Sequence, residues 1–288
     1  MVLFSEGPIR FLQSFSPPWL DAFFNVATDV GDRMILFGLT MLLWWLWDKR
    51  IGFFVATTLL VSAAANGLLK EAFGMPRPDP SLWKTGTSGN GFPSGHAQQT
   101  TAFASSAALR MGRIGIPLGV AGVALVSVSR VVLGVHFVGD VLGGIGFGVL
   151  VLVGIVAASR ATFWSTLGFR TRIAIALLAP SGVQAVLFLG FGQVLTALGL
   201  LTGLSLGYIL ESRFVGMERP SGRAAILIRL LAGGAVLAAL EAIRGPVPAA
   251  WEYGYLGLVG LIAAAGLPWL FVRLEALGPG RTGAAERA

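Results

Sequence analysis

Apolar runs long enough to cross a lipid bilayer recur along almost the whole chain, and they constrain its fold more than any other feature. A hydrocarbon core about 30 Å thick needs roughly 20 apolar residues in a helix, because a backbone in lipid must satisfy its hydrogen bonds internally. Composition agrees, since 55% of the residues are hydrophobic and 12% are charged. We therefore predict an all-α polytopic membrane helix bundle of about nine transmembrane helices. The predicted spans lie near 34–47, 51–69, 97–109, 114–129, 137–158, 173–190, 194–210, 224–243 and 254–272.

The first part of the chain has a different character. Prolines and aspartates interrupt the aromatic residues between Pro8 and Asp32, so residues 1–32 are interpreted as a segment that lies at the membrane interface without crossing it. Residues 33–160 are predicted to form a helical core that holds the polar motifs described below. Residues 161–288 are predicted to form a four-helix transmembrane extension, and we find no chemical motif in that part of the sequence.

Basic residues divide unevenly between the two sides of this arrangement. With the N-terminus outside, 14 of the 21 Lys and Arg residues fall on the cytoplasmic face, as the positive-inside rule expects. We therefore predict an outer N-terminus and a cytoplasmic C-terminus. The net charge of +7 then reflects topology and gives no reason to expect a nucleic-acid partner. The basic residues left on the outer face are Arg10, Arg33, Lys70, Arg77, Lys84, Arg130 and Arg244.

Three polar clusters fall on that outer face, at residues 70–78, 93–96 and 129–140. Charged side chains at membrane depth are costly, so a group of them is a candidate for function. Lys70, Arg77 and Arg130 supply three cations without a repeated basic stripe, which suits a compact, multiply charged anion such as phosphate. Ser94 and Gly95 stand where a helix is predicted to begin, and amides at a helix N-terminus bind phosphate well.

The two histidines of the chain both lie in these clusters. His136 and Asp140 are four residues apart, so on a helix the carboxylate can hold one ring nitrogen while the other points outward. An imidazole oriented in this way is a nucleophile or a base. His96 remains as a second proton-handling group that can protonate a leaving oxygen. The residues therefore predict attack of His136 on phosphorus, with His96 as the general acid.

Each residue also has a simpler interpretation when taken alone. A single histidine at a helix end is more often a packing residue, Arg130 or Lys84 can reach to lipid phosphates, and Asp140 can cap a helix. The joint occurrence of both histidines and three outer cations in three short blocks favours the chemical interpretation. Other small or polar residues are interpreted as helix contacts, namely Gly139, Gly143, Gly144, Gly148 and Gln98–Thr101.

The three blocks, K-x6-R-P at 70–78, P-S-G-H at 93–96 and S-R-x5-H-x3-D at 129–140, resemble the three-part signature of the type 2 phosphatidic acid phosphatase (PAP2) superfamily. All eleven defining residues are present at the spacings of that family, and the resemblance covers roughly residues 30–158. Membrane members hydrolyse lipid phosphates or diphosphates without a metal, through a phosphohistidine intermediate. The resemblance therefore implies no cofactor and no metal. It assigns His136 as nucleophile, Asp140 as its orienting partner, His96 as general acid, and Lys70, Arg77, Ser94, Gly95 and Arg130 as phosphate ligands.

The length of the chain bears on the substrate. The predicted layout has two spans before the first block and about four after the last, and is similar to the glucose-6-phosphatase and sphingosine-phosphate phosphatase branches. Nine spans argue against the soluble haloperoxidases of the same superfamily. The leading hypothesis is an integral membrane phosphatase of a bacterial inner membrane, with its site on the outer face. Its partners would be membrane lipids and a phosphorylated lipid such as phosphatidic acid, phosphatidylglycerol phosphate, polyprenyl diphosphate or a sphingoid phosphate.

Two alternatives stay open. One is a phosphatase or phosphotransferase that uses the same site on a soluble sugar phosphate. The other is a lipid-binding membrane protein that keeps a phosphate site without hydrolysis. The oligomeric state is not indicated by the sequence.

Overall fold

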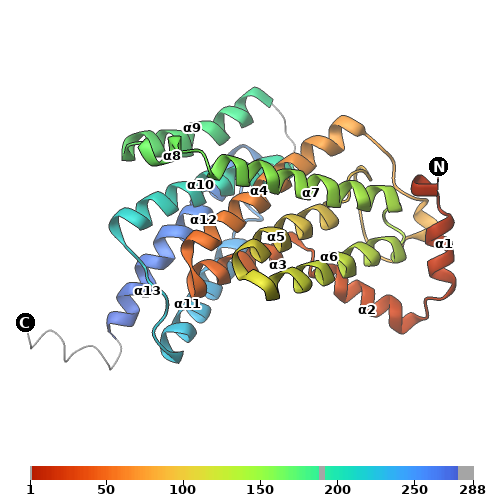
Figure 1. Cartoon of the computed structure of the whole chain (residues 1–288), viewed down its shortest axis with the longest axis horizontal. Helices are drawn as coiled ribbons and strands as arrows, with labels where there is room; N and C mark the ends of the chain where they lie inside the picture. Colours follow the sequence, from red (N-terminus) through yellow and green to blue (C-terminus); the bar gives the residue numbers. More distant parts are fainter. Residues whose placement is uncertain (1, 188–191, 278–288) are drawn as a thin grey trace, which may run out of the picture. The chain divides into compact units, whose positions relative to one another are not determined.

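The computed structural model describes residues 2–187 and 192–277, and every regular element in those ranges is a helix (Figure 1). The predicted all-α class is thereby confirmed. The α-helices are α1 (Gly7–Ser14), α2 (Pro18–Asp29), α3 (Arg33–Leu42), α4 (Lys49–Phe73), α5 (Gly95–Met111), α6 (Gly115–Val132), α7 (Val138–Ser159), α8 (Phe163–Thr166), α9 (Phe169–Leu187), α10 (Gly192–Phe214), α11 (Arg223–Ala242), α12 (Ala249–Leu261) and α13 (Leu267–Ala276). The shorter elements are the 3-10 helices η1 (Val2–Phe4), η3 (Pro80–Leu82) and η4 (Gly112–Ile114) and the π-helices η2 (Leu43–Trp47) and η5 (Ile262–Gly266).

The chain divides into two compact units. The first contains residues 1–40 and 54–164, and the second contains residues 41–53 and 165–288. The three polar clusters predicted to carry chemistry all lie in the first unit.

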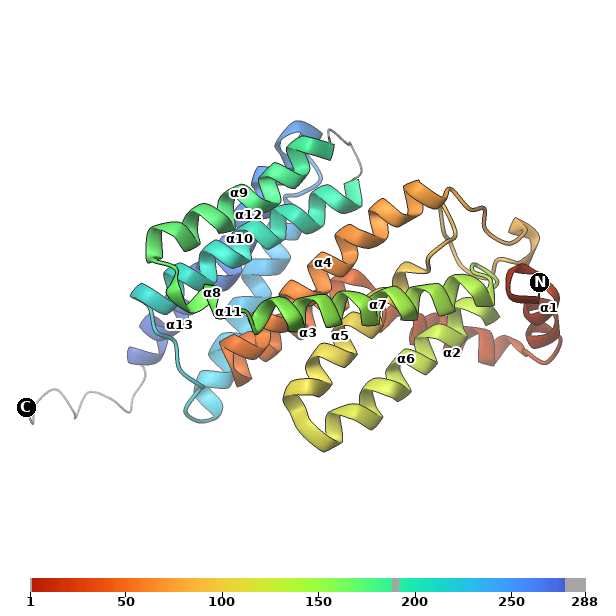
Figure 2. The same cartoon turned by 45° about the horizontal axis from the view of Figure 1, so that its top comes forward.

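Six segments of the described chain are long and apolar enough to cross a membrane, and a shorter apolar stretch covers Arg33–Trp47. The predicted number of nine is not confirmed by this count. One reason is that α5 and α6, predicted as two spans, form a single segment over 95–132 that turns back at η4 (Figure 2). Another is that the predicted span 173–190 ends outside the described residues. The six segments are 49–73, 95–132, 138–159, 194–214, 223–242 and 250–276.

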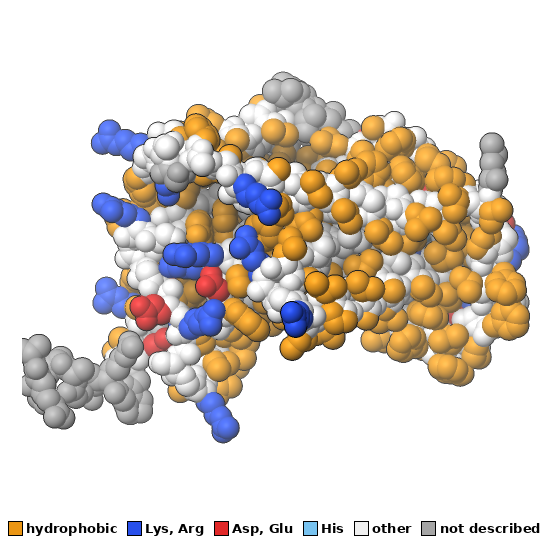
Figure 3. Space-filling view, viewed as in Figure 1, with side chains coloured by type: hydrophobic (Ala, Val, Ile, Leu, Met, Phe, Trp, Pro, Cys, Tyr) orange, Lys and Arg blue, Asp and Glu red, His pale blue; other side chains and the backbone are white. Residues whose placement is uncertain are grey.

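Large hydrophobic side chains cover the outward faces of α6 and α7 in the first unit (Figure 3). A continuous apolar surface of this kind is costly in water and is what a helix in contact with lipid presents. The exposed residues include Ile116, Leu118, Val120, Leu142, Leu150 and Val153.

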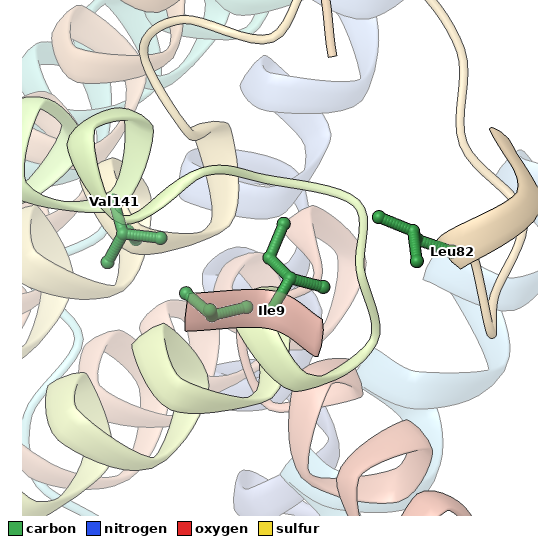
Figure 4. Packing of buried hydrophobic residues seen from close by; sticks show 5 residues of the cluster. Ile9, Leu82 and Val141 are labelled. Atoms are coloured by element: carbon green, nitrogen blue, oxygen red, sulfur yellow. The ribbon is translucent and has the colours of Figure 1, made fainter. Parts of the chain in front are cut away.

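The N-terminal segment forms two short helices that pack against α6. The longer one, α2, has 12 residues and spans about 18 Å, too short for a bilayer core of about 30 Å. Ile9 of α1 is fully buried among Leu82, Val141 and two further residues, Ala97 and Val131 (Figure 4). The Gln13 amide donates to the carbonyls of Leu82 and Val132, both at 2.9 Å. The segment is therefore docked on the first unit by buried contacts.

The second unit is organised around a buried cation and a buried indole. Arg229 of α11 is 2% exposed and pairs with Glu275 at 2.7 Å. Trp45 of η2 donates its indole N–H to the carbonyl of Ala263 in η5 at 3.0 Å. These contacts join segments that are far apart in the sequence, and η2 is thus fixed to the C-terminal helices of its own unit.

Helix α7 approaches α5 closely because two glycines face the contact. A Cβ at Gly144 would lie 2.6 Å from the carbonyl oxygen of Ser94, and one at Gly148 would lie 2.7 Å from that of Gln98. Both distances are shorter than any real Cβ contact, so α5 would have to move. The prediction that these glycines serve helix packing is confirmed. Because Ser94 immediately precedes α5 and His96 lies in it, while α7 carries Asp140, this contact sets the distance between two of the polar clusters.

We predict that Gly148→Ala destabilises the protein by about 1–3 kcal/mol through overpacking, and lowers activity because α5 shifts. Gly146→Ala is the matched control, since a Cβ there meets nothing within 4 Å and an alanine in a helix gains about 0.5–1 kcal/mol over glycine. Denaturant titration of both variants in detergent, with an activity assay, measures the difference. Equal effects of the two substitutions would contradict this account of the helix contact.

Candidate active site

The three polar clusters meet where α4, α5, α6 and α7 end or begin in the first unit. Arg77, in the loop after α4, reaches His136 in the link between α6 and α7, with 3.1 Å between Nη1 and Nε2. The backbone N–H of Ser94 donates to the carbonyl of Asp140 at 2.9 Å. The cluster at 70–78 thus contacts the cluster at 129–140 through side chains. The cluster at 93–96 contacts it through the backbone.

A tight turn brings His136 back beside the end of α6. Gly134 has a positive φ of 73°, which favours glycine, and a Cβ there would overlap the carbonyl of Leu82. Leu133 in the same turn accepts a hydrogen bond from the backbone N–H of Lys84 at 2.9 Å. The loop around η3 therefore packs directly on the link that carries His136.

His136 and Asp140 form the pair that the spacing predicts. His136 Nδ1 lies 3.2 Å from Asp140 Oδ2, and the two side chains are 2% and 0% exposed. The same carboxylate oxygen accepts the backbone N–H of Phe137, the residue that caps α7, at 2.9 Å. The two interpretations of Asp140 are therefore compatible, because it caps the helix and holds the histidine at once.

Arg77 decides which nitrogen of His136 carries the proton. A guanidinium can only donate hydrogen bonds, so Nε2 must accept with its lone pair. The proton then lies on Nδ1, where it can be donated to Asp140. The pKa of His136 is lowered well below its ordinary value by burial and then by the positive charge of Arg77. The ring is thus neutral, with a lone pair on Nε2.

Backbone carbonyls hold Arg77 in place. Nε donates to Gly89 at 2.9 Å, Nη2 donates to Ser88 at 2.9 Å, and Nη1 also donates to Val135 at 2.9 Å. Burial lowers the pKa of Arg77, although Asp140 opposes the shift. The Gly- and Ser-rich loop of residues 86–91, which precedes α5, therefore orients this arginine.

Lys70 and Arg130 complete the group of cations. Lys70 donates to the carbonyls of Asn90 and Gly91. Arg130 is 4% exposed; its Nη1 donates to the Thr28 hydroxyl at 2.9 Å, and its Nε has no hydrogen-bond partner in the described chain. Among the described residues, none of the three cations forms an ion pair within 4.0 Å. Buried cations without a counter-ion are costly, so the group is arranged to receive an anion.

Ser94 and Gly95 stand at the start of α5, as predicted. Ser94 is the residue before the helix, is fully buried, and has a hydroxyl without a partner in the described residues. The amides of the first helical turn have no carbonyl partner inside the helix and are available to an anion. Gly95 is needed for fit, because a Cβ there would lie 3.0 Å from Asn66 Oδ1.

His96 lies one residue further along α5 and is half-buried. Its ring packs against the turn after α2, since a Cβ at Gly31 would lie 3.3 Å from His96 Cδ2. In the part of the chain that the structure describes, no hydrogen bond fixes its ring, so its nitrogens are available for proton transfer.

Two further residues contact the site without having been predicted from the sequence, Asn66 and Thr28. The Asn66 amide donates to the carbonyl of Pro93 at 3.2 Å and to Gln98 Oε1 at 2.8 Å, which ties α4 to the start of α5. Gln98 in turn donates to the carbonyl of Ser62 at 3.0 Å, so its predicted interhelical role is confirmed. The sequence does contain an indication of the role of Asn66, because it is a polar residue in an apolar helix one turn before Lys70. No sequence pattern indicates the role of Thr28.

The described residues contain no cluster of three or more His, Asp or Glu side chains that could hold a metal ion. The predicted absence of a metal in the reaction stays a prediction.

Comparison with known proteins places all three clusters in one family region. Residues 51–164 match the model of the PAP2 superfamily, and residues 195–279 match the model described as PAP2 superfamily phosphatase, transmembrane extension. A lipid A 1-phosphatase of Rhizobium etli is 34% identical over 112 residues, which cover 36% of this chain and 48% of that protein. A decaprenylphosphoryl-5-phosphoribose phosphatase of Mycobacterium tuberculosis is 49% identical over 61 residues, which cover 21% of this chain and 32% of that protein. The chain thus spans about half or less of the length of these curated relatives.

Among solved structures, a transmembrane PAP2-type phosphatidylglycerolphosphate phosphatase from Bacillus subtilis aligns with a TM-score of 0.47 and 25% identity, covering 55% of this chain and 86% of that one.

We predict that Asp140→Asn lowers kcat by about a thousandfold, because an amide can donate to Nδ1 and so place the ring proton on Nε2. Asp79→Asn is the matched control, since Asp79 also caps a helix, η3, by accepting from the backbone N–H of Ser81 at 2.8 Å. Steady-state kinetics with melting curves separate the chemical effect from a folding effect. A folded Asp140→Asn variant with wild-type kcat would contradict the tautomer assigned to His136.

Proposed function

Because the chain belongs to the PAP2 superfamily, we propose that it is an integral membrane phosphatase that removes a terminal phosphate from a lipid phosphate monoester or diphosphate. The observation that carries the proposal is the chain of contacts from Arg77 through His136 to Asp140, at 3.1 and 3.2 Å. It presents a neutral, oriented imidazole beside three cations that form no ion pair within 4.0 Å among the described residues.

In the proposed first step, Nε2 of His136 attacks phosphorus and the bond from phosphorus to the leaving oxygen breaks. The leaving oxygen takes a proton from His96. The phosphoryl group that enters the site replaces the contact of Arg77 with Nε2, and Lys70, Arg77 and Arg130 neutralise its oxygens. Ser94 and the amides that begin with Gly95 supply further donors. No metal enters either step.

In the second step, water attacks the phosphohistidine and gives its proton to His96. The bond between Nε2 and phosphorus breaks, and inorganic phosphate leaves. The carboxylate of Asp140 stabilises the ring while it carries positive charge after phosphoryl transfer, which accounts for its place on Nδ1.

Two features support a lipid as substrate. The curated relatives bear names that include lipid A and a decaprenyl phosphoryl group. The first unit also exposes hydrophobic side chains close to the site in sequence, such as Phe73 on α4 and Leu142 on α7. An acyl or prenyl chain can stay in the bilayer against these residues while its phosphate meets the cations. We place the site on the outer face of a bacterial inner membrane, with residues 161–288 as an extension within the bilayer.

We expect purified protein to hydrolyse lipid phosphates with a higher kcat/KM than glucose 6-phosphate, and to do so equally well in EDTA. The lipid panel contains phosphatidic acid, phosphatidylglycerol phosphate, a polyprenyl diphosphate and a sphingoid phosphate. His136→Ala serves as the inactive control. Preference for the soluble ester would overturn the lipid assignment, and binding of all these lipids without hydrolysis would favour a non-catalytic lipid-binding protein. Loss of activity in EDTA would overturn the metal-free mechanism.

We predict that His96→Ala slows hydrolysis of an alkyl phosphate by about 10²–10⁴-fold and of p-nitrophenyl phosphate much less. The reason is that nitrophenolate leaves without a proton, whereas an alkoxide needs one. Single-turnover rates for both esters measure the effect on chemistry alone. Equal losses for the two esters would remove His96 from the general-acid role.

A further inference from the structure

One phosphate-binding cation is held by a residue outside the family region. Nη1 of Arg130 donates to the hydroxyl of Thr28 at 2.9 Å, and both side chains are 4% exposed. Thr28 belongs to α2, in the N-terminal segment, and lies 102 residues away in the sequence. The region that matches the PAP2 superfamily begins only at residue 51.

Arg130 depends on this contact for its position. Within the described residues, Thr28 is the sole hydrogen-bond partner of its guanidinium, and Nε has none. A long arginine side chain has substantial rotamer entropy, so one anchored nitrogen restricts the directions in which the others point. Nε and the second terminal nitrogen are thereby left for an anion.

The hydroxyl of Thr28 differs from those of four other buried threonines in the described chain. Thr40, Thr58, Thr101 and Thr202 each donate to the carbonyl four residues earlier in the same helix, at 2.7–2.9 Å. This is the usual contact of a threonine within a helix. Within the described chain, Thr28 makes no such bond, and its oxygen accepts from Arg130 instead. Its hydroxyl therefore serves the contact between helices.

The next turn of the chain contacts the other side of the site. A Cβ at Gly31 would lie 2.7 Å from Val126, 2.9 Å from the hydroxyl of Thr100 and 3.3 Å from the His96 ring. The glycine lets the backbone come this close. The stretch from Thr28 to Gly31 therefore touches both the phosphate-binding Arg130 and the histidine assigned as general acid.

Polar contacts fix the rest of the segment on the first unit. Asp21 of α2 pairs with Lys84 at 2.7 Å, and Gln13 donates to the carbonyl of Val132, two residues after Arg130 on α6. The opposite face of α2 is apolar and exposed at positions spaced like one side of a helix, namely Trp19, Phe23, Val26 and Val30. Helix α2 thus has one face toward the site and one face suited to lipid.

We propose that the end of α2, Thr28–Gly31, is a wall of the active site, with Thr28 as the positioning residue of Arg130. The proposal rests on the proposed function, because it assigns Arg130 to the phosphate. It makes the N-terminal segment a part of the catalytic unit, although that segment lies outside the region shared with the family.

The test compares Thr28→Val, which keeps the shape and removes the hydroxyl, with Thr28→Ser, which keeps the hydroxyl. Thr58→Val is the matched control, because it removes a buried hydroxyl whose one hydrogen bond among the described residues is to the carbonyl of Phe54 in its own helix. We expect Thr28→Val to raise KM for the ester and Kd for orthophosphate by about tenfold, since a hydrogen bond to a charged group is lost. We expect Thr28→Ser and Thr58→Val to stay within about twofold of wild type. Orthophosphate binding is measured by thermal shift, so that it does not depend on any substrate.

A double-mutant cycle separates positioning from general stability. In an Arg130→Gln background, Thr28→Val should cause no further loss of orthophosphate affinity. The proposal is overturned if Thr28→Val binds orthophosphate as wild type does, if Thr28→Ser fails to restore binding, or if the loss persists without Arg130. If the wild type hydrolyses no ester of the panel while orthophosphate binding still depends on Thr28, the proposed function fails and the positioning role stands.

Discussion

The removal of three cations from water around one carboxylate is the constraint on which the rest of the first unit depends. Arg130 is 4% exposed, Lys70 and Arg77 are half-buried, and the negative charge of Asp140 offsets only part of the cost for Lys70 and Arg77. The protein offsets this cost mainly with neutral acceptors, since Arg77 alone reaches three backbone carbonyls. Carbonyl oxygens solvate a cation without cancelling its charge, so the cations keep their attraction for an anion. A second carboxylate in the same place would have stabilised the empty protein at the expense of ligand binding.

Burial and the same cations together set the state of the proposed nucleophile. Burial disfavours a charge on His136 and lowers its pKa, and the positive charge of Arg77 disfavours the imidazolium further, so the ring stays neutral. Asp140, as an anion, favours positive charge on the ring instead. It also holds the ring proton on Nδ1, away from the cations. The charge of Asp140 is itself placed at the start of α7, where the helix dipole favours an anion. His136, Asp140 and the cations are therefore one electrostatic arrangement in which each position limits the others.

Whether the sequence predicts a contact in this site depends on how far apart the two residues lie along the chain. The pair His136 and Asp140 follows from helical spacing, and the three blocks follow from their charges in an apolar chain. The contact of Thr28 with Arg130 spans 102 residues and involves a residue type that is common at helix ends, so no local pattern indicates it. The backbone carbonyls that hold Arg77 cannot be predicted from the sequence either, because every residue has a carbonyl. The number of spans depends on a similar point, because α5 carries buried polar residues from Gln98 to Thr101 and α6 follows it directly after the turn at η4, so that the two helices count as one apolar segment.

The glycines of α7 connect packing to chemistry. Gly139 faces Phe4, Gly143 faces Phe92, and Gly144 faces the carbonyl of Ser94, each at a distance that a Cβ would not permit. Three separate segments, η1, the loop before α5 and the start of α5, thus close onto the first turns of one helix. Those are the turns that carry Asp140, whose carbonyl accepts the Ser94 amide at 2.9 Å. Small residues in a membrane helix usually allow two helices to associate. In α7 they also bring the start of α5, proposed to bind phosphate, within one hydrogen bond of Asp140, the proposed orienting residue. The close packing of this helix therefore also fixes the geometry of the candidate site.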